Sequence, residues 1–192
     1  MIKLKIKIED QEVQQALRRL AAQGKSLKPA MRDIGEYMVE STKRRFAEGK
    51  GPDGTPWASN TEATMLAHLF RRSGGTSRRK GEKGSNLYRQ DGRLNKRGER
   101  QVMGKRPLIG ESKRLGNEIH YLATGGSVEI GSSLEYSAVQ QFGAGKGEFG
   151  RSKRGPIPWG DIPARPFLGF SDEDKANVLD ILQEHLEAAI NG

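Results

Sequence analysis

A long basic segment with almost no aliphatic side chains interrupts the middle of the chain. Lysine and arginine prevail between Arg71 and Arg106, which gives that stretch a net charge of about +10, and glycine and serine are frequent there. Residues 71–101 hold too little apolar surface to offset the entropy that a chain loses on ordering. We therefore predict a flexible insertion or arm over residues 73–105, and a core formed by the rest of the chain.

The rest of the chain is close to neutral, since the whole protein of 192 residues has a formal net charge of +9. That length suits a single domain over residues 1–192, with a core that needs no metal or disulfide. The lack of cysteine excludes disulfides and thiolate metal sites. No apolar run approaches the roughly 20 residues that span a bilayer. We expect a soluble protein that is made and kept in a cytoplasm, without a membrane partner.

Hydrophobic periodicity predicts the elements of the N-terminal half. Residues 2–8 alternate isoleucine or leucine with lysine, which is typical of a strand with one buried face. Helical spacing follows over residues 10–24 and again over residues 27–47, where the apolar positions are Met31, Ile34, Tyr37, Met38 and Phe46. The stretch 51–57 is dense in turn-forming residues and is predicted to be a loop. A short helix is expected over residues 61–71.

The C-terminal half predicts a small sheet and a final helix. Residues 119–123 and 127–130 form two strands around a glycine pair that fits a tight hairpin. Residues 136–142 are a short helix or a turn, and residues 143–163 are a second loop rich in glycine and proline. An amphipathic helix begins after Ser171, its predicted cap, with an acidic first turn and the apolar stripe Val178, Leu179, Leu182, Leu186, Ala189 and Ile190. The predicted fold class is α+β: a small antiparallel sheet packed with N-terminal helices and a C-terminal amphipathic helix, plus a long basic loop.

Residue patterns typical of enzymes are lacking. His68, His120 and His185 lie on different predicted elements, and no pair has metal-ligand spacing. Residues 145–150 match G-x-G-x-x-G, but neither a clear strand before them nor a helical pattern after them supports a nucleotide site. No serine lies in a G-x-S-x-G elbow. We predict a protein without catalytic residues, metal or cofactor.

Three passages share their order and spacing with one known family. The first is Arg45-Phe46 followed by the loop 51–57, and the second runs from Pro107-Leu108-Ile109 to Ile119. The third combines the strand 128–131, Tyr136-Ser137-Ala138, Gln141-Phe142-Gly143 and the sequence P-A-R-P-F-L-G over residues 163–169. Together they resemble the phage virion morphogenesis family, the tail-completion proteins of phages.

This resemblance implies a structural protein of the virion, located in its tail or neck and assembled in the cytoplasm of the bacterial host. Such a protein completes the tail or neck and enables head–tail joining. It works as a homo-oligomeric ring, and its partners are further copies of itself and other tail, neck or connector proteins. The alternative is a stand-alone basic nucleic-acid-binding protein, which predicts basic residues on folded elements as well as in a loop.

The motif residues have a physical interpretation beside the resemblance. Residues 163–169 form a stiff extended approach to the last helix, because proline fixes its own φ and disfavours a helical residue before it. Gly143 is expected at positive φ. The residues assigned to the structural motif are Pro52, Asp53, Gly54, Tyr136, Gln141, Gly143, Pro163, Pro166, Phe167, Leu168 and Gly169.

Three residues are candidates for a subunit or partner interface, namely Trp57, Phe142 and Arg165. Trp57 is either a lid over the core or an aromatic anchor of the interface. Arg165 either satisfies groups within its own chain or meets a carboxylate of a neighbouring subunit. The basic segment either touches packaged DNA through non-specific phosphate contacts, orders against an acidic partner, or is solvated. Its candidate contact residues are Arg71, Arg72, Arg78, Arg79, Lys80, Lys83, Arg93, Lys96, Arg97 and Arg100.

Overall fold

The computed structural model divides the chain into two compact units. Unit 1 comprises Met1–Trp57 with Gly110–Gly192, and unit 2 comprises Ala58–Ile109. The structure describes residues 11–22, 26–61, 65, 89, 93–103, 106–109, 112–153, 155–158 and 160–191. The strand predicted over residues 2–8 and most of the helix predicted over residues 61–71 lie outside these described residues.

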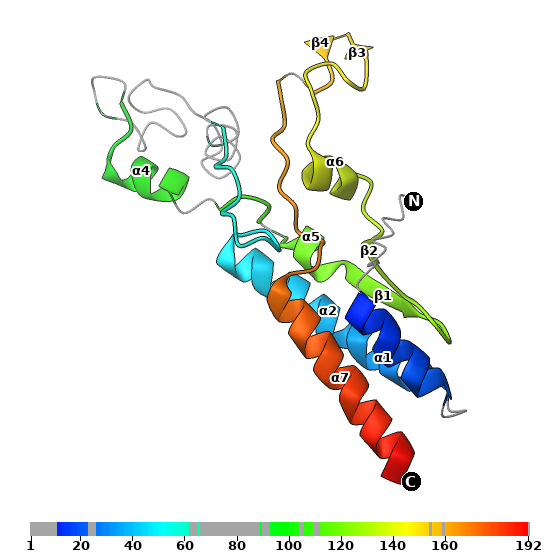
Figure 1. Cartoon of the computed structure of the whole chain (residues 1–192). Helices are drawn as coiled ribbons and strands as arrows, with labels where there is room; N and C mark the ends of the chain where they lie inside the picture. The colour runs from blue at the N-terminus through cyan, green and yellow to red at the C-terminus, as the bar shows by residue number, and fades with distance from the viewer. Residues whose placement is uncertain are drawn as a thin grey trace. The chain divides into compact units, whose positions relative to one another are not determined.

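Three helices form one side of unit 1. They are α1 (Gln11–Ala22), α2 (Lys28–Glu48) and α7 (Asp172–Asn191), and all three were predicted. Helix α7 packs against both α1 and α2 (Figure 1). The apolar stripes of the three helices meet in a core of Val13, Ala30, Met31, Ile34, Met38, Val178 and Leu182.

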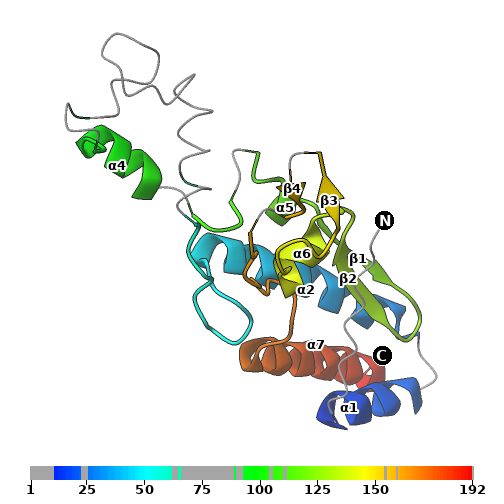
Figure 2. The same cartoon turned by 90° about the horizontal axis from the view of Figure 1, so that it is seen from above.

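An antiparallel hairpin covers the other side of α2. Strand β1 (Ile119–Ala123) pairs with β2 (Val128–Ser132), with Tyr121 opposite Ile130. Figure 2 shows α2 between this hairpin and the α1–α7 pair. Gly35 makes the close approach possible, because a Cβ at this position would lie 2.3 Å from the Tyr121 ring. The predicted hairpin and the α+β fold class are confirmed.

The end of α2 leads into the predicted loop. Gly49 closes the helix with φ 76° and donates its N–H to the Arg45 carbonyl at 2.7 Å. In the loop, the Asp53 carboxylate accepts hydrogen bonds from the N–H and the hydroxyl of Thr55, at 3.0 and 2.8 Å. These bonds lower the pKa of Asp53 and fix a tight turn, in which Gly54 has φ 76°. Two short helices, α5 (Arg114–Asn117) and α6 (Ser137–Phe142), complete the helical part of unit 1.

The segment predicted as a loop over residues 143–163 contains a short two-stranded ribbon among its turns, and we use the name ribbon for the described residues between 144 and 162. Its strands are β3 (Arg151–Ser152) and β4 (Gly155–Pro156), and backbone hydrogen bonds extend the pairing back to Ala144 and Ile162. Glycines at positive φ make its turns, and the Pro158 carbonyl accepts the Gly147 N–H at 3.1 Å. Proline has no N–H to donate, but at this position the ribbon needs only its carbonyl as an acceptor. A segment rich in glycine and proline, which suggested a loop, can therefore still form paired strands.

Unit 2 contains a helix within residues 73–105, which were predicted to be a flexible insertion or arm. This helix, α4, spans Lys96–Met103, and the flexibility of the whole segment stays a prediction. Asn95 caps the helix: its side-chain oxygen accepts the N–H groups of Arg97 and Gly98 at 2.9 and 3.0 Å. Such a cap, followed by the acidic Glu99, favours a helix although aliphatic residues are scarce in it. None of the described helices is long and apolar enough to cross a membrane.

Candidate interface

Three aromatic rings from separate parts of unit 1 meet beside the end of α2. Phe46 lies between Trp57 of the loop and Phe167, with ring centroids 5.3 and 5.4 Å apart. The Trp57 indole N–H donates to the Pro166 carbonyl at 2.7 Å. Trp57, Phe167 and Leu168 are all buried. The first and third motif passages therefore meet in space, and Trp57 fastens the loop to residues 163–169.

Gln141 holds the same segment from the other side. Its side-chain oxygen accepts the N–H groups of Phe167 and Leu168 at 2.9 and 3.0 Å, and its side-chain amide donates to the Leu168 carbonyl at 2.8 Å. The buried amide of Gln141 therefore satisfies main-chain groups that have no strand partner. We call this arrangement the Gln141 clamp. It links α6, from which the ribbon starts, to the core residues Phe167 and Leu168.

A buried ion pair fixes the entry to α7. The Arg45 guanidinium contacts the Asp174 carboxylate, and it also donates to the carbonyls of Phe167 and Gly169 at 3.0 and 3.1 Å. Both charged side chains are almost fully buried. Because the carboxylate and the two carbonyls occupy the guanidinium donors, Arg45 ties α2 to residues 167–169 and to α7 together.

Hydroxyl groups complete the surroundings of Asp174. Burial by itself raises the pKa of this carboxyl group. Hydrogen bonds from Ser171 and Ser41 outweigh that effect, helped by the charge of Arg45, and the pKa of Asp174 lies below its usual value. Tyr37 also donates to Asp174, at 3.2 Å. Burial raises the pKa of Tyr37, and the neighbouring Asp174 carboxylate raises it further. Tyr37 therefore stays protonated and Asp174 stays ionised, as the hydrogen bond between them requires.

Close contacts, one with backbone and one with a side chain, explain two of the motif glycines. Gly143 has φ 78°, as predicted, and a Cβ there would lie 2.8 Å from the Ile162 carbonyl oxygen. A Cβ on Gly169 would lie 2.5 Å from the Pro52 ring, which joins the loop to the final approach to α7. The Gly143 contact holds the start of the ribbon close to its end. The Gly169 contact holds the loop 51–57 against residues 163–169.

The three candidate interface residues have different surroundings. Trp57 and Arg165 are buried within unit 1, whereas 65% of Phe142 is exposed. The Arg165 N–H donates to the Gln140 carbonyl at 2.8 Å, and burial lowers the pKa of its guanidinium. Burial of Trp57 agrees with a lid over the core. A part for any of the three in a contact between subunits stays a prediction.

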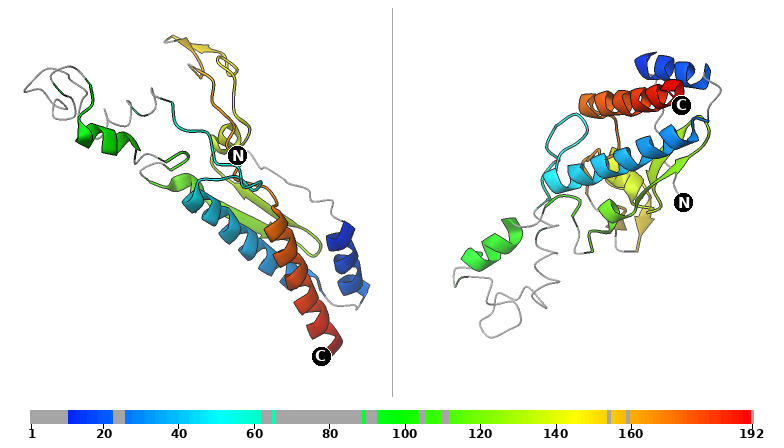
Figure 3. Two further views of the ribbon diagram at one scale, coloured as in Figure 1. Left: turned by 60° about the vertical axis from the view of Figure 1, so that its left-hand side comes forward. Right: turned by 90° about the horizontal axis from the view of Figure 1, so that it is seen from below.

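Apolar side chains are exposed along the ribbon and at its base. Phe149 is 55% and Ile157 42% exposed, and the two are neighbours because the Phe149 N–H donates to the Ile157 carbonyl at 2.9 Å. Tyr136 and Phe142 are exposed on and beside α6. The ribbon stands away from α1, α2 and α7 in both Figure 1 and Figure 3. Of these residues only Phe142 was a candidate from the sequence; Phe149 and Ile157 were not, because a predicted loop has no defined exposed face.

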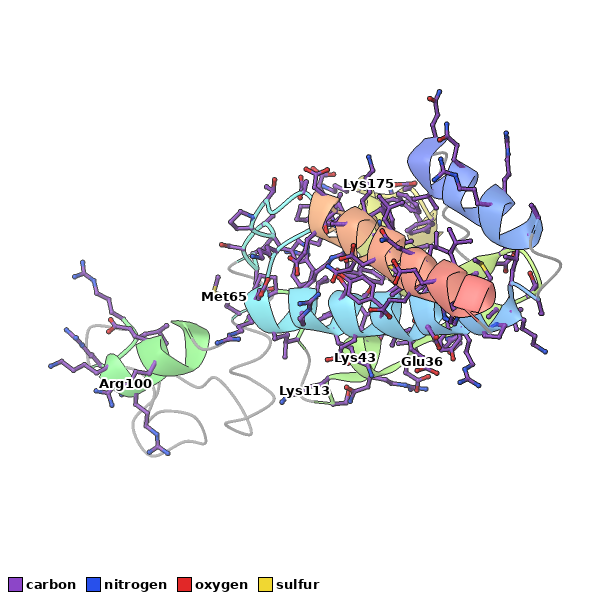
Figure 4. The ribbon with its side chains drawn as sticks, turned by 60° about the horizontal axis from the view of Figure 1, so that its bottom comes forward. Glu36, Lys43, Met65, Arg100, Lys113 and Lys175 are labelled. Carbon is purple, nitrogen blue, oxygen red and sulfur yellow. The ribbon has the colours of Figure 1, made fainter. Side chains whose placement is uncertain are left out.

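The basic candidates that the structure describes belong to unit 2. Arg93, Lys96, Arg97 and Arg100 are all exposed, and Figure 4 shows Arg100 projecting from α4. The remaining candidates lie outside the described residues: Arg71, Arg72, Arg78, Arg79, Lys80 and Lys83. A contact of either group with DNA or an acidic protein stays a prediction.

In the part of the chain that the structure describes, no three His, Asp or Glu side chains are placed to hold a metal ion. His185 contacts Asp33 at 2.7 Å, on the far ends of α7 and α2 from the Gln141 clamp. The G-x-G-x-x-G match over residues 145–150 forms a turn of the ribbon and is followed by β3, not by a helix.

One comparison with known proteins gives a match that extends over most of the chain. A model of the phage virion morphogenesis family matches residues 8–96 and 86–187. No match was found among curated proteins or among solved structures. The matched ranges include both the aromatic contact and the Gln141 clamp.

Proposed function

The chain belongs to the phage virion morphogenesis family, and from this membership we propose that it completes the tail or neck of the virion and enables head–tail joining. Family membership itself implies a role in phage virion morphogenesis and an association with the virion. The proposal adds the stage of assembly, at which a finished tail becomes competent to join a DNA-filled head. The protein does this without catalysis, by binding.

The ribbon is the observation that carries this proposal. A two-stranded ribbon is marginally stable in water unless it packs on something else. Here the Gln141 clamp and Gly143 fix its base to the core, while Phe149 and Ile157 remain exposed along it. Exposed apolar side chains on a firmly anchored element are a feature of protein–protein contact sites. The ribbon is thus built to bind another protein of the particle.

We propose that the protein acts as a ring. A ring needs one surface that contacts a different surface on the next copy, in an arrangement that closes. The ribbon and residues 51–57 of the loop both belong to unit 1 and present different surfaces, as a head-to-tail contact requires. Other tail, neck or connector proteins would bind the faces of the ring.

The exposed cations of α4 favour an accessory contact with packaged DNA. Lys96, Arg97 and Arg100 are exposed on one short helix, next to the most basic stretch of the sequence. Contacts of this kind are non-specific and weaken steeply with salt. A stand-alone nucleic-acid-binding protein is the second candidate function, and these same residues favour it. The two candidates differ in what loss of the gene does to particle assembly.

Electron microscopy of lysates from a phage with a null allele of this gene tests the proposal. DNA-filled heads lying separate from tails are expected, and supplying the wild-type protein from a plasmid should restore joined particles. Intact, infectious particles from the null allele would refute the assembly role and favour nucleic-acid binding.

A further inference from the structure

Helix α7 has an acidic stripe on its solvent side, although the protein as a whole is basic. The helix contains six carboxylates and one lysine. Five of the carboxylates are exposed, and four of these recur at helical spacing, so that the four lie along one face. We define the acidic stripe as these residues: Glu173, Asp180, Glu184 and Glu187.

No described residue neutralises the middle of the acidic stripe. Glu173 contacts Arg44 at 3.3 Å, and Glu187 accepts a hydrogen bond from Gln183 at 3.0 Å. Among the residues that the structure describes, the carboxylates of Asp180 and Glu184 have neither a hydrogen bond nor an ion pair. Leu179 and Ile181 are the neighbours of Asp180 in the sequence; both pack against the core and remain partly exposed. The surface is therefore a negative centre with apolar borders.

The ribbon has the opposite charge. Lys146, Arg151 and Lys153 are exposed, and within the described residues none of their side chains has a partner. Both carboxylates of the ribbon are occupied by its own backbone: Glu148 accepts the Gly145 N–H at 2.7 Å, and Asp161 accepts the Lys146 N–H at 2.8 Å. The charge that the ribbon offers to another molecule is therefore positive, and it lies beside the exposed apolar pair defined above.

The ribbon and the acidic stripe do not meet in one copy. Both belong to unit 1, and in Figures 1 and 3 the β3–β4 end of the ribbon stands away from α7. We propose that the ribbon of one copy docks on the acidic stripe of a second copy. This inference rests on the proposed function and names the partner that the ribbon binds. Because the two surfaces differ, the contact is head-to-tail and can repeat around a closed ring.

The two surfaces fit each other in both apolar area and charge. Phe149 and Ile157 can cover the borders of the stripe at Leu179 and Ile181, and burial of apolar area supplies most of the affinity. The cations of the ribbon then oppose Asp180 and Glu184. Charge pairs of this kind mainly set the register and exclude wrong partners. Reversing the charges on either surface should therefore block docking, and reversing both should restore it.

A charge exchange tests this contact in phage that lacks the gene. One full-length variant carries Arg151→Glu and Lys153→Glu, and another carries Asp180→Lys and Glu184→Lys. Each is expected to lower the titre of infectious particles at least about tenfold, because like charges then face each other. The variant with all four changes should recover most of the lost titre. So should co-expression of the two double variants, since each then meets a complementary neighbour.

A matched control changes the same amount of charge elsewhere. Lys28→Glu with Lys43→Glu alters two exposed lysines of α2, and Figure 4 shows Lys43 on the side of this helix away from α7. This control should keep the wild-type titre. A fourfold variant that stays as defective as its parents, when all variants melt like the wild type, overturns the proposed contact.

Cross-linking gives a second measurement that does not depend on charge. The protein has no cysteine, so Lys153→Cys with Glu184→Cys introduces a defined pair. A short bismaleimide added to assembled particles should link chains into multimers. The pair Lys153→Cys with Lys43→Cys should give few. Equal cross-linking of the two pairs would overturn the contact. If infectious titre depends on the gene but neither the charge exchange nor the cross-linking gives the expected result, the assembly role stands and only this contact is refuted. If phage with the null allele is infectious, the assembly role itself is refuted.

Discussion

Replacing Gln141 by leucine removes the Gln141 clamp while nearly keeping the volume of the side chain. The main-chain N–H groups of Phe167 and Leu168 and the Leu168 carbonyl then lose their partner in a buried place. No neighbouring strand can take over, because residues 163–169 belong to no described sheet. The variant Gln141→Leu therefore tests whether one side chain holds this segment to the core.

The expected loss of stability follows from these groups. A buried donor or acceptor without a partner costs about 1–3 kcal/mol. Three such groups give about 3 kcal/mol at the low end of that range, and we expect the free energy of unfolding to fall by about 3–5 kcal/mol. That is a large part of the roughly 5–15 kcal/mol by which domains are usually stable.

Urea unfolding followed by tryptophan fluorescence measures this change. The protein has two tryptophans, and a Trp159→Phe background leaves Trp57 as the reporter next to Pro166. Gln140→Leu is the matched control on the same helix, because the Gln140 side chain has no hydrogen bond among the described residues. A loss below about 1 kcal/mol for Gln141→Leu, or one equal to that of the control, would refute the reasoning.

Three further predictions concern the ion pair, the ribbon base and the basic segment. Asp174→Asn leaves Arg45 buried without its counter-charge and should cost about 3–5 kcal/mol in urea unfolding. The pKa of Asp174 is lower in the folded protein than in the unfolded chain, so its ionised carboxylate stabilises the fold fully above the unfolded pKa of about 4. This stabilisation is lost as the pH falls through the folded pKa, and acid should therefore destabilise the wild type more than Asp174→Asn. Parallel pH profiles of the two proteins would contradict this. Gly143→Ala should lower the melting temperature clearly, because Gly143 has φ 78° and a backbone oxygen would lie 2.8 Å from the new Cβ. Gly126→Ala is the control and should leave the melting temperature unchanged, because no atom lies within 4 Å of its Cβ position. Equal shifts in the two variants would contradict the contact at Gly143. Deleting residues 73–105 should abolish salt-sensitive binding to duplex DNA in a titration. Unit 1 of the deletion variant should still melt cooperatively. If the variant keeps its affinity for DNA, the basic segment is not the DNA contact.

Local patterns sufficed to predict the helices and the hairpin of unit 1. Apolar spacing predicted α2 and α7, and Ser171 was correctly named as the cap of α7. The Ser171 hydroxyl accepts the Asp174 N–H at 3.1 Å, and the Asp174 carboxylate accepts the Ser171 N–H at 2.8 Å. Signals of this kind lie within a few residues, so they can be read without knowledge of the fold.

The buried ion pair could not be predicted from such local patterns, although each of its residues lies on the buried stripe of its helix. Arg45 continues the buried stripe of α2 through Met38, and Asp174 lies four residues before Val178 on the buried stripe of α7. In the sequence, Asp174 is one of three carboxylates in the acidic first turn of α7, next to Asp172 and Glu173. Which acidic residue of that turn faces α2 depends on how the two helices pack, and that is a property of the fold.

The ribbon shows a second limit. Glycine and proline are common in loops, and composition alone cannot reveal that the Gly147 N–H pairs with the Pro158 carbonyl across the ribbon. Pairing between distant residues is decided by what fixes the two ends. Here Gly143 and the bridge between Ala144 and Ile162 bring the ends together. The Gln141 clamp then holds both ends against the core.

The residues that identify the family and the residues that we propose to bind partners are largely different. Gln141 and Phe167 of the motif are buried and hold residues 163–169 in place. The exposed Phe149 and the cations of the ribbon lie between the motif passages, and the acidic stripe lies after them. The motif therefore specifies a rigid support, whereas the surfaces that it supports can change without loss of the fold. It follows that substitutions in the motif should act through stability, and substitutions in the ribbon or the acidic stripe through assembly at unchanged stability.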